Sequence, residues 1–388
     1  MSEAAESLLK RVLDLAGEII DADRVAAAKR RQADMFAWRQ SDSVPIIFGV
    51  SVDALKGLPD FDWAEQFADP AASLYMQMKS VVCAAAGGGD YVPTVRADTG
   101  VINGPSVFGA PFDVPAHTKP VITGRIPKSG LAAFEVPEDL AGLGAVPTMV
   151  RHTRHHLAAL AEAGLDDRVG VRHCDLQGPF DIAAQAYGHD AIFLDLYEDG
   201  DFVHALMSKC AEVYVRLARL SKQLAGDPTD SGYANEYWTG RGSVRLCDDS
   251  GILVSAELYE EFLAPYLSRA LEPFGGGWIH YCGGVPDGHR PEGLHLHEVY
   301  CSVPSMRGLQ FTTGKDWPAE VKKVIARQVV YLGSLPRGRE EPLEAYFRRA
   351  LELCDGRRGM ILDAAVRPEE APSAVETWQR VQEEVWPN

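Results

Sequence analysis

The chain has 388 residues, 46% of them hydrophobic and 24% charged, which is the balance of an ordinary globular protein rather than a disordered or membrane-embedded one. Asp and Glu total 55 against 38 Lys and Arg, and the formal charge of −17 repels phosphate backbones and anionic lipid headgroups. Nucleic acid and membrane surfaces are therefore not expected partners, whereas a homo-oligomer stays open. No apolar run reaches the roughly 20 residues that span a bilayer. The acidic start and the odd number of dispersed cysteines, seven, predict a reduced, cytoplasmic protein.

The predicted elements begin with one or two helices over residues 8–38, where apolar positions recur at helical spacing. Short apolar segments then alternate with helical stretches. The predicted strands are 44–50, 169–174, 243–247, 278–282, 308–311, 329–332 and 359–362. Such alternation predicts the α/β class with a parallel sheet and right-handed crossovers. We predict a (β/α)₈ TIM barrel over residues 41–388, preceded by an N-terminal helical extension over residues 1–40.

A barrel of this kind builds its active site from the loops that follow its strands. Among the cysteines, Cys174, Cys247 and Cys282 lie at predicted strand ends. His280 and Cys282 are two residues apart on one strand, so both side chains should point to the same face. Imidazole and thiolate are zinc ligands, but a catalytic zinc takes three protein ligands, and a buried cysteine beside a hydrogen-bonded histidine gives the same spacing.

Carboxylates and arginines at neighbouring strand ends are further candidates. Asp175, Asp248 and Asp249 could serve as metal ligand, general base or cation clamp, or simply cap the next helix. An inward-facing arginine would suit a substrate carboxylate, and a strand-to-helix turn could hold an anion. The candidate substrate-binding residues are Arg172, Gln177, Arg245 and Tyr281.

Four stretches, taken in order, resemble the uroporphyrinogen decarboxylase superfamily in its branch of methylcobamide:coenzyme M and related corrinoid-dependent methyltransferases. They are residues 92–112 (VPTVRADTGVINGPSVFGAPF), 174–199 (CDLQGPFDIAAQAYGHDAIFLDLYED), 244–266 (VRLCDDSGILVSAELYEEFLAPY) and 279–284 (IHYCGG). The resemblance extends over roughly residues 40 to 385. True decarboxylases carry an RQAGRY-type motif near the N-terminus, where this chain has only Trp38, Arg39 and Gln40, so haem biosynthesis is not expected.

The resemblance implies a barrel enzyme that holds zinc through an H-x-C motif, matched by His280 and Cys282, together with a later cysteine. The corresponding late segment, 361–366, contains no cysteine. Either Asp363, Asp249 or Cys247 replaces the missing ligand, or the zinc has been lost. The resemblance also implies a methylcobamide (cobalamin) co-substrate on a separate corrinoid carrier protein, with zinc activating a thiol or other small acceptor.

Two other functions stay open at this point. A metal-free decarboxylase or lyase would use an aspartate among Asp175, Asp248 and Asp249 to stabilise a cationic intermediate, with Arg172 or Arg245 holding the carboxylate. A non-catalytic corrinoid- or ligand-binding subunit would keep the barrel without the chemistry. Metal content would distinguish the zinc-dependent methyltransferase from the metal-free decarboxylase or lyase. Turnover with a methyl donor would distinguish both enzymes from the non-catalytic subunit.

Overall fold

The computed structural model describes residues 3–283, 292–311 and 317–387, so Gly284 of the IHYCGG stretch lies outside the described residues. The strands are β1 Ile46–Ile47, β2 Thr94–Arg96, β3 Phe112–Asp113, β4 Val121–Ile122, β5 Gly170–Arg172, β6 Gly232–Ala234, β7 Tyr237–Thr239, β8 Val244–Cys247, β9 Gly277–His280, β10 Met306–Gln310, β11 Val330–Gly333 and β12 Met360–Asp363. The helices are α1 Glu3–Ile19, α2 Ala22–Phe36, α3 Trp63–Ala68, α4 Pro70–Ala86, α5 Asn103–Val107, α6 Lys128–Ala133, α7 Val146–Glu162, α8 Pro179–Tyr187, α9 His189–Glu198, α10 Gly200–Ala225, α11 Ala256–Phe262, α12 Ala264–Leu271, α13 His297–Ser302, α14 Trp317–Ala326, α15 Leu343–Leu351 and α16 Ala371–Val385.

A parallel sheet of six strands organises the fold, in the order β1-β12-β11-β10-β9-β8. The last strand of the chain lies beside the first, with Ile46 opposite Leu362. Strands β2 and β5 form a separate parallel pair, in which Arg96 faces Arg172. The α/β class and the parallel sheet are confirmed. The closed barrel stays a prediction, because no ladder in the described part of the chain joins the β2–β5 pair to the six strands.

Individual contacts are made at the two outer edges of the β2–β5 pair. At the β2 edge, the Gln77 amide of α4 donates to the Arg96 carbonyl (2.8 Å) and accepts from the Arg96 N–H (2.9 Å), so it satisfies backbone groups that have no neighbouring strand among the described residues. On the other side, a single bridge pairs Gln177 with Cys247. Gly178 permits this approach, since a Cβ there would lie 2.5 Å from the Cys247 carbonyl oxygen.

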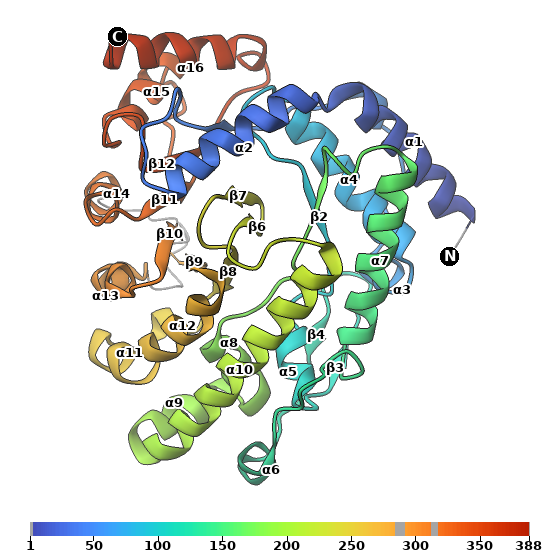
Figure 1. The fold of residues 1–388 in the computed structure, drawn as a ribbon, viewed down its shortest axis with the longest axis vertical. Helices are drawn as coiled ribbons and strands as arrows, with labels where there is room; N and C mark the ends of the chain where they lie inside the picture. The colour runs from blue at the N-terminus through green and yellow to red at the C-terminus, as the bar shows by residue number, and fades with distance from the viewer. Residues whose placement is uncertain (1–2, 284–291, 312–316, 388) are drawn as a thin grey trace.

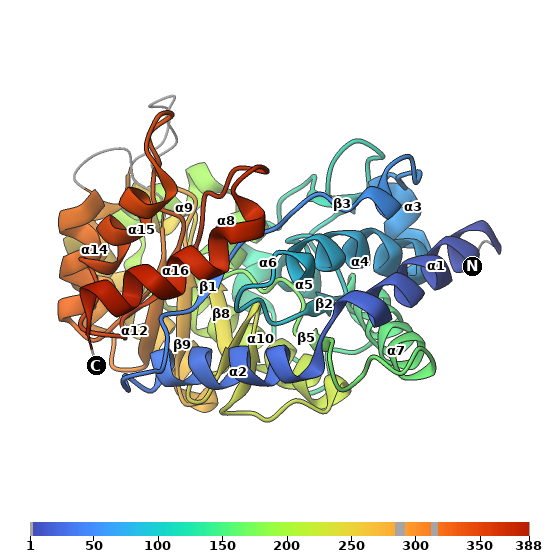
Figure 2. The same cartoon turned by 90° about the horizontal axis from the view of Figure 1, so that it is seen from above.

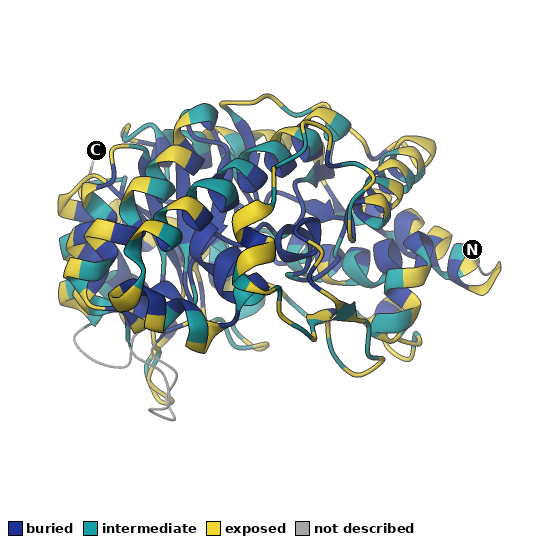
Figure 3. Ribbon diagram, turned by 90° about the horizontal axis from the view of Figure 1, so that it is seen from below, coloured by how far each residue is buried: buried dark blue, intermediate teal, exposed yellow. Residues whose placement is uncertain are grey.

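Helices surround the strands in Figures 1 and 2, and the two termini lie at opposite ends of the molecule. Figure 3 shows buried strands inside and exposed faces on the helices outside. Helix α1 packs its apolar stripe, which includes Leu9 and Val12, into a cluster with α4 and α7. Helix α2 ends at Met35 and Phe36 in an inner cluster with Trp278 and other inward-facing strand residues. Both leading helices therefore contribute to the core, and a domain boundary at residue 40 stays a prediction.

The inner cluster also contains the β6–β7 hairpin, whose Tyr237 packs edge-on against Trp278. The indole of Trp278 donates to the Ala234 carbonyl of the hairpin at 2.9 Å. This apolar floor fills one end of the space that the strands enclose, and polar side chains begin above it. Within the described residues, no helix combines the length and apolarity needed to cross a membrane.

Candidate functional site

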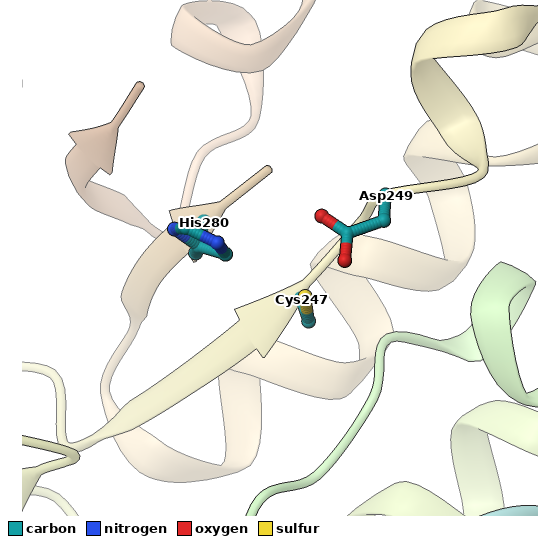
Figure 4. A group of neighbouring side chains, drawn as sticks. All are labelled: Cys247, Asp249 and His280. Carbon is teal, nitrogen blue, oxygen red and sulfur yellow. The ribbon is translucent and has the colours of Figure 1, made fainter. Parts of the chain in front are cut away.

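The C-terminal ends of β8 and β9 bring three potential metal ligands together. Cys247 lies opposite His280 in the parallel register, and Asp249 follows two residues after Cys247. The cysteine sulfur, a carboxylate oxygen and an imidazole nitrogen all lie within 4.8 Å of one another (Figure 4). Cys282 is not part of this group of three, but its Sγ lies 3.1 Å from His280 Nε2. Strand alternation places His280 and Cys282 on one face, as the sequence spacing predicts.

Gln310 fixes the orientation of His280. It is the residue opposite His280 on β10, and its Oε1 lies 2.8 Å from His280 Nδ1. An N–H on Nδ1 leaves the Nε2 lone pair directed at the other donors, which is the usual arrangement of a metal-bound histidine. Burial, assisted by Arg245, lowers the pKa of His280, so the imidazole is held in the neutral state that a ligand requires.

Asp181, at the start of α8, holds the loop that carries Asp249. Its carboxylate accepts the backbone N–H groups of Asp249 (2.9 Å) and Ser250 (2.8 Å). The Asp249 side chain in turn accepts the backbone N–H of Cys282 at 2.6 Å. Burial, with Asp248 nearby, raises the pKa of Asp181 well above its usual range. Asp181 was not a candidate from the sequence. The only signal for it there is its position in the first turn of a predicted helix.

Asp248 lies in the same loop but points away from the four donors. It is buried and accepts hydrogen bonds from the hydroxyls of Tyr300 (2.8 Å) and Tyr259. Burial raises the pKa of Asp248 to about 6, although both tyrosines act in the opposite direction. The Asp248 side chain is thus hydrogen-bonded to tyrosines of the outer core, and these bonds hold the loop that follows β8.

The chemistry of the donor set fits zinc. Two sulfurs, one imidazole and one carboxylate are the ligand types that zinc takes in proteins, whereas magnesium and calcium prefer oxygen alone. Burial raises the pKa of the Cys247 thiol well above its usual range, since a thiolate there is poorly solvated. A divalent cation at this point would supply the missing stabilisation of the thiolate.

A layer of charged side chains lies beneath these donors. Arg245 precedes Cys247 by two residues on β8 and so faces the same way. Asp175 joins Arg245 (2.6 Å) to Arg96 (3.1 Å). Burial alone would raise the pKa of Asp175, but Arg245 and Arg96 outweigh it and hold that pKa below its usual range. Gln177 also donates to Asp175, at 3.4 Å. Asp175 is therefore a paired counter-ion.

Glu236 enters the same layer from the turn between β6 and β7. Its charge contributes to the pKa shifts of Arg96, Arg172 and Arg245, which come from three different strands, so it lies near all three. The side chain is half-buried and accepts a hydrogen bond from Asn235, whose φ of 56° belongs to a tight turn. Sequence reasoning missed Glu236 because it missed this hairpin.

The remaining candidates lie elsewhere. Asp363 ends β12 with an exposed side chain, and it is not part of the ligand group found among the described residues. Tyr281 points to the outer core, where its hydroxyl lies 2.6 Å from His297 Nε2. Cys174 is also buried in the outer core, with its N–H donated to Ser221 of α10. The structure thus brings Cys247, Asp249, His280 and Cys282 together, but neither Asp363 nor Tyr281 joins them.

Comparison with known proteins gives a likeness of fold. No family model matches the chain, and no curated protein sequence matches it. Among solved structures, the chain is similar to a methyltransferase from Methanosarcina mazei, with a TM-score of 0.64 and 15% sequence identity. The match covers 92% of this chain and 99% of the other. At this identity the likeness shows a shared fold over nearly the whole of both chains.

Proposed function

We propose that the protein is a methyltransferase that transfers a methyl group from a methylcobamide to a thiol or another small acceptor, with the assistance of zinc. The observation that carries the proposal is the convergence of Cys247, Asp249 and His280 at the ends of β8 and β9, with Cys282 Sγ beside His280 Nε2. The fold shared with a methyltransferase supports the class of reaction. The sequence resemblance to corrinoid-dependent methyltransferases supports the choice of co-substrate and its delivery by a carrier protein.

His280, Cys282 and Cys247 would hold the zinc. One histidine with two cysteines is the donor set that the resemblance implies, so Cys247 takes the place of the late cysteine that this chain lacks. Asp249 is the fourth donor, and a catalytic site needs one position open for substrate. Its bond to the Cys282 N–H suits it to orient that ligand, and its half-buried carboxylate can receive a proton from an incoming thiol.

When bound, zinc lowers the pKa of the acceptor thiol, so that the thiolate is available near neutral pH. Methyl transfer would form a bond from the acceptor sulfur to the methyl carbon and break the cobalt–carbon bond, with the bonding electron pair left on the corrinoid. Asp249 accepts the thiol proton at a carboxylate oxygen and releases it to solvent. His280, fixed by Gln310, and Cys282 would hold the metal that positions the acceptor sulfur.

The metal-free decarboxylase receives less support from the site. Two of its three aspartates are already engaged, Asp175 by Arg96 and Arg245, and Asp248 by two tyrosine hydroxyls. Neither is placed to stabilise a new cation without breaking those bonds. A carboxylate paired in this way stabilises the protein rather than an intermediate.

The test of the proposed function is metal content followed by turnover. Protein purified without chelator should carry about one zinc per chain. With methylcobalamin and a panel of small thiols, the zinc-loaded protein should produce thioether and demethylated corrinoid, and the stripped protein should not. Zinc-free protein as purified that also fails to bind added zinc would contradict the proposal, as would thioether formation unaffected by removal of the metal.

A further inference from the structure

Helix α7 carries three histidines close together, His152, His155 and His156. Residues three and four positions apart lie on one face of a helix, so the three rings share a face. That face is directed into the protein, because His152 and His156 are both fully buried. His155 is half-buried, with its Nε2 3.5 Å from the carboxylate of Glu6 on α1. Two ionisable rings are thus enclosed where α7 packs against α4.

Each of the two buried rings has a nitrogen lone pair that the polypeptide does not use. His152 Nε2 lies 3.1 Å from the Phe67 carbonyl oxygen, so Nε2 carries the proton and Nδ1 is left as an acceptor. His152 Nδ1 and the nitrogens of His156 make no hydrogen bond within the described part of the chain. The Pro70 carbonyl acts to raise the pKa of His156, so one nitrogen faces a carbonyl and the other keeps its lone pair. A buried acceptor without a donor is unfavourable, and a metal ion would relieve this.

The surroundings keep both rings neutral. Burial lowers the pKa of His152 to about 4 and that of His156 well below its usual range. Asp69 opposes the shift at His152, and Asp98 opposes it at His156, but neither outweighs burial. Neutral imidazole is the form that binds metal ions, and the two carboxylates make the region favourable for a cation.

The spacing of the two rings suits a metal ion between them. The ring centres of His152 and His156 are 6.0 Å apart. A metal about 2 Å from one nitrogen of each ring separates the ring centres by roughly 6 Å when the two bonds are nearly in line. Among the described residues, three donors within 4.8 Å of one another occur only at Cys247, Asp249 and His280. The histidine pair therefore offers two ligands, which are too few for zinc.

We propose that His152 and His156 bind Cu⁺ in a two-coordinate site on α7, separate from the donors at the ends of β8 and β9. Copper accepts imidazole ligands, and the filled d shell of Cu⁺ favours two ligands in line. A monovalent ion also loses less hydration energy on burial than a divalent one, because that energy grows with the square of the charge. The ring centre of His155 lies 6.1 Å from that of His156, and its partial exposure gives the ion a path from solvent.

The test is a titration of zinc-loaded protein with Cu⁺ under anaerobic conditions, in competition with the chromogenic chelator bicinchoninate. Wild type should bind one more Cu⁺ than His156→Leu, because leucine fills the space but offers no donor. His156→Met should bind as much copper as wild type, since a thioether is a good ligand for Cu⁺. Both replacements remove buried acceptors without donors, so both should fold. His117→Leu, at an exposed histidine, is the control and should keep the wild-type stoichiometry.

X-ray absorption at the copper edge identifies the donors. The difference spectrum between wild type and His156→Leu should show nitrogen neighbours alone, and that between His156→Met and His156→Leu one nitrogen and one sulfur. Cu⁺ should also raise the melting temperature of wild type more than that of His156→Leu. Equal copper stoichiometry in wild type and His156→Leu, or a difference spectrum with only sulfur neighbours, would overturn the inference. Copper binding is the quantity measured, so the result does not depend on whether the protein transfers methyl groups.

Discussion

Two polar layers lie inside the sheet, one above the other on the same strands. In the upper layer Cys247 of β8 faces His280 of β9, and in the lower layer Arg245 faces Trp278. The upper layer offers sulfur and nitrogen lone pairs from groups that are neutral when no metal is bound. The lower layer offers fixed cations, most of them already paired. The first suits a cation and the second an anion.

This difference shows how one strand can contribute to two layers of different charge. Inward-facing positions recur every second residue, so the same β8 strand supplies a donor to each layer. Trp278 closes the lower layer from below, with the Arg245 guanidinium 5.7 Å from its ring centre. The Arg245 guanidinium is thereby shielded from water, and its ion pair with Asp175 gains strength.

The largest effect should follow from removing the upper layer. We expect His280→Ala combined with Cys282→Ala to abolish zinc binding, because one thiol and one carboxylate are too few ligands for a stable site. His280 is half-buried and Cys282 exposed, so the fold should persist. Zinc content and circular dichroism would check this. Cys83→Ala combined with Cys301→Ala is the control, and loss of zinc there would place the metal elsewhere.

The lower layer should matter for stability rather than for metal. We expect Asp175→Asn to destabilise the fold by about 3 kcal/mol at pH 7, since it leaves Arg96 and Arg245 buried without their shared counter-ion. Urea unfolding would measure the change, with Glu260→Gln, an exposed carboxylate, as control. Zinc affinity should be unaffected, and a large loss of zinc would mean that the layers are not separable.

The effect of Asp175 should depend on pH in a defined direction. Its pKa is lower in the folded protein than in the unfolded chain, where it is about 3.9. The stabilisation is therefore complete above pH 4 and declines as the pH falls toward the folded-state value. The gap in unfolding free energy between wild type and Asp175→Asn should be constant from pH 7 to 5 and shrink below pH 4. A gap that widens on acidification would contradict the assignment.

Much of the upper layer could be predicted from the sequence. Seven predicted strands appear at or near their expected places, and the i, i+2 spacing of His280 and Cys282 placed both on one face. Cys247 and Asp249 were also predicted as candidate ligands, because both lie at the end of a predicted strand. The same alternation places Tyr281 on the opposite face from His280, whereas Cys174 follows the end of β5 and packs in the outer core although it lies two residues after Arg172.

The lower layer was harder to predict. Arg172 and Arg245 were candidates only if inward-facing, and that parity needed the register of β5 and β8. Arg96 and Glu236 were missed because β2 is only three residues long and the β6–β7 turn gives a weak hairpin signal. Asp363 was placed at a strand end correctly, but the position of that strand relative to β8 depends on the whole sheet.

Within the upper layer, Cys247 and Asp249 should not be equivalent. We expect Cys247→Ser to weaken zinc binding by about 100-fold, because it removes a ligand, and Asp249→Asn by about tenfold or less, because it disturbs only the orientation of Cys282. Asp363→Asn should have no effect. Competition titration against a chromogenic chelator would rank the three. A greater loss from Asp249→Asn would make the ligand set His280, Cys282 and Asp249 instead.

An effect similar in size to that of Asp249→Asn should come from Gln310, which touches no proposed substrate or metal. Its amide oxygen holds His280 Nδ1 at 2.8 Å, and its amide nitrogen lies 3.4 Å from the Tyr237 hydroxyl. Gln310→Ala frees the imidazole to rotate or to carry its proton on Nε2, so each zinc-binding event must first reorder the ring. We expect about tenfold weaker zinc binding, with the zinc stoichiometry unchanged at saturation.

Gln310→Glu sharpens the same prediction, because a carboxylate acceptor fixes the same tautomer and makes the imidazole a better donor to the metal. It should therefore bind zinc at least as tightly as the wild type, while Gln223→Ala, an exposed glutamine of α10, should change nothing. If Gln310→Ala and Gln310→Glu weaken zinc binding equally, the side chain acts by packing alone. The proposed orientation of His280 would then be wrong, even if His280 itself proved to be a ligand.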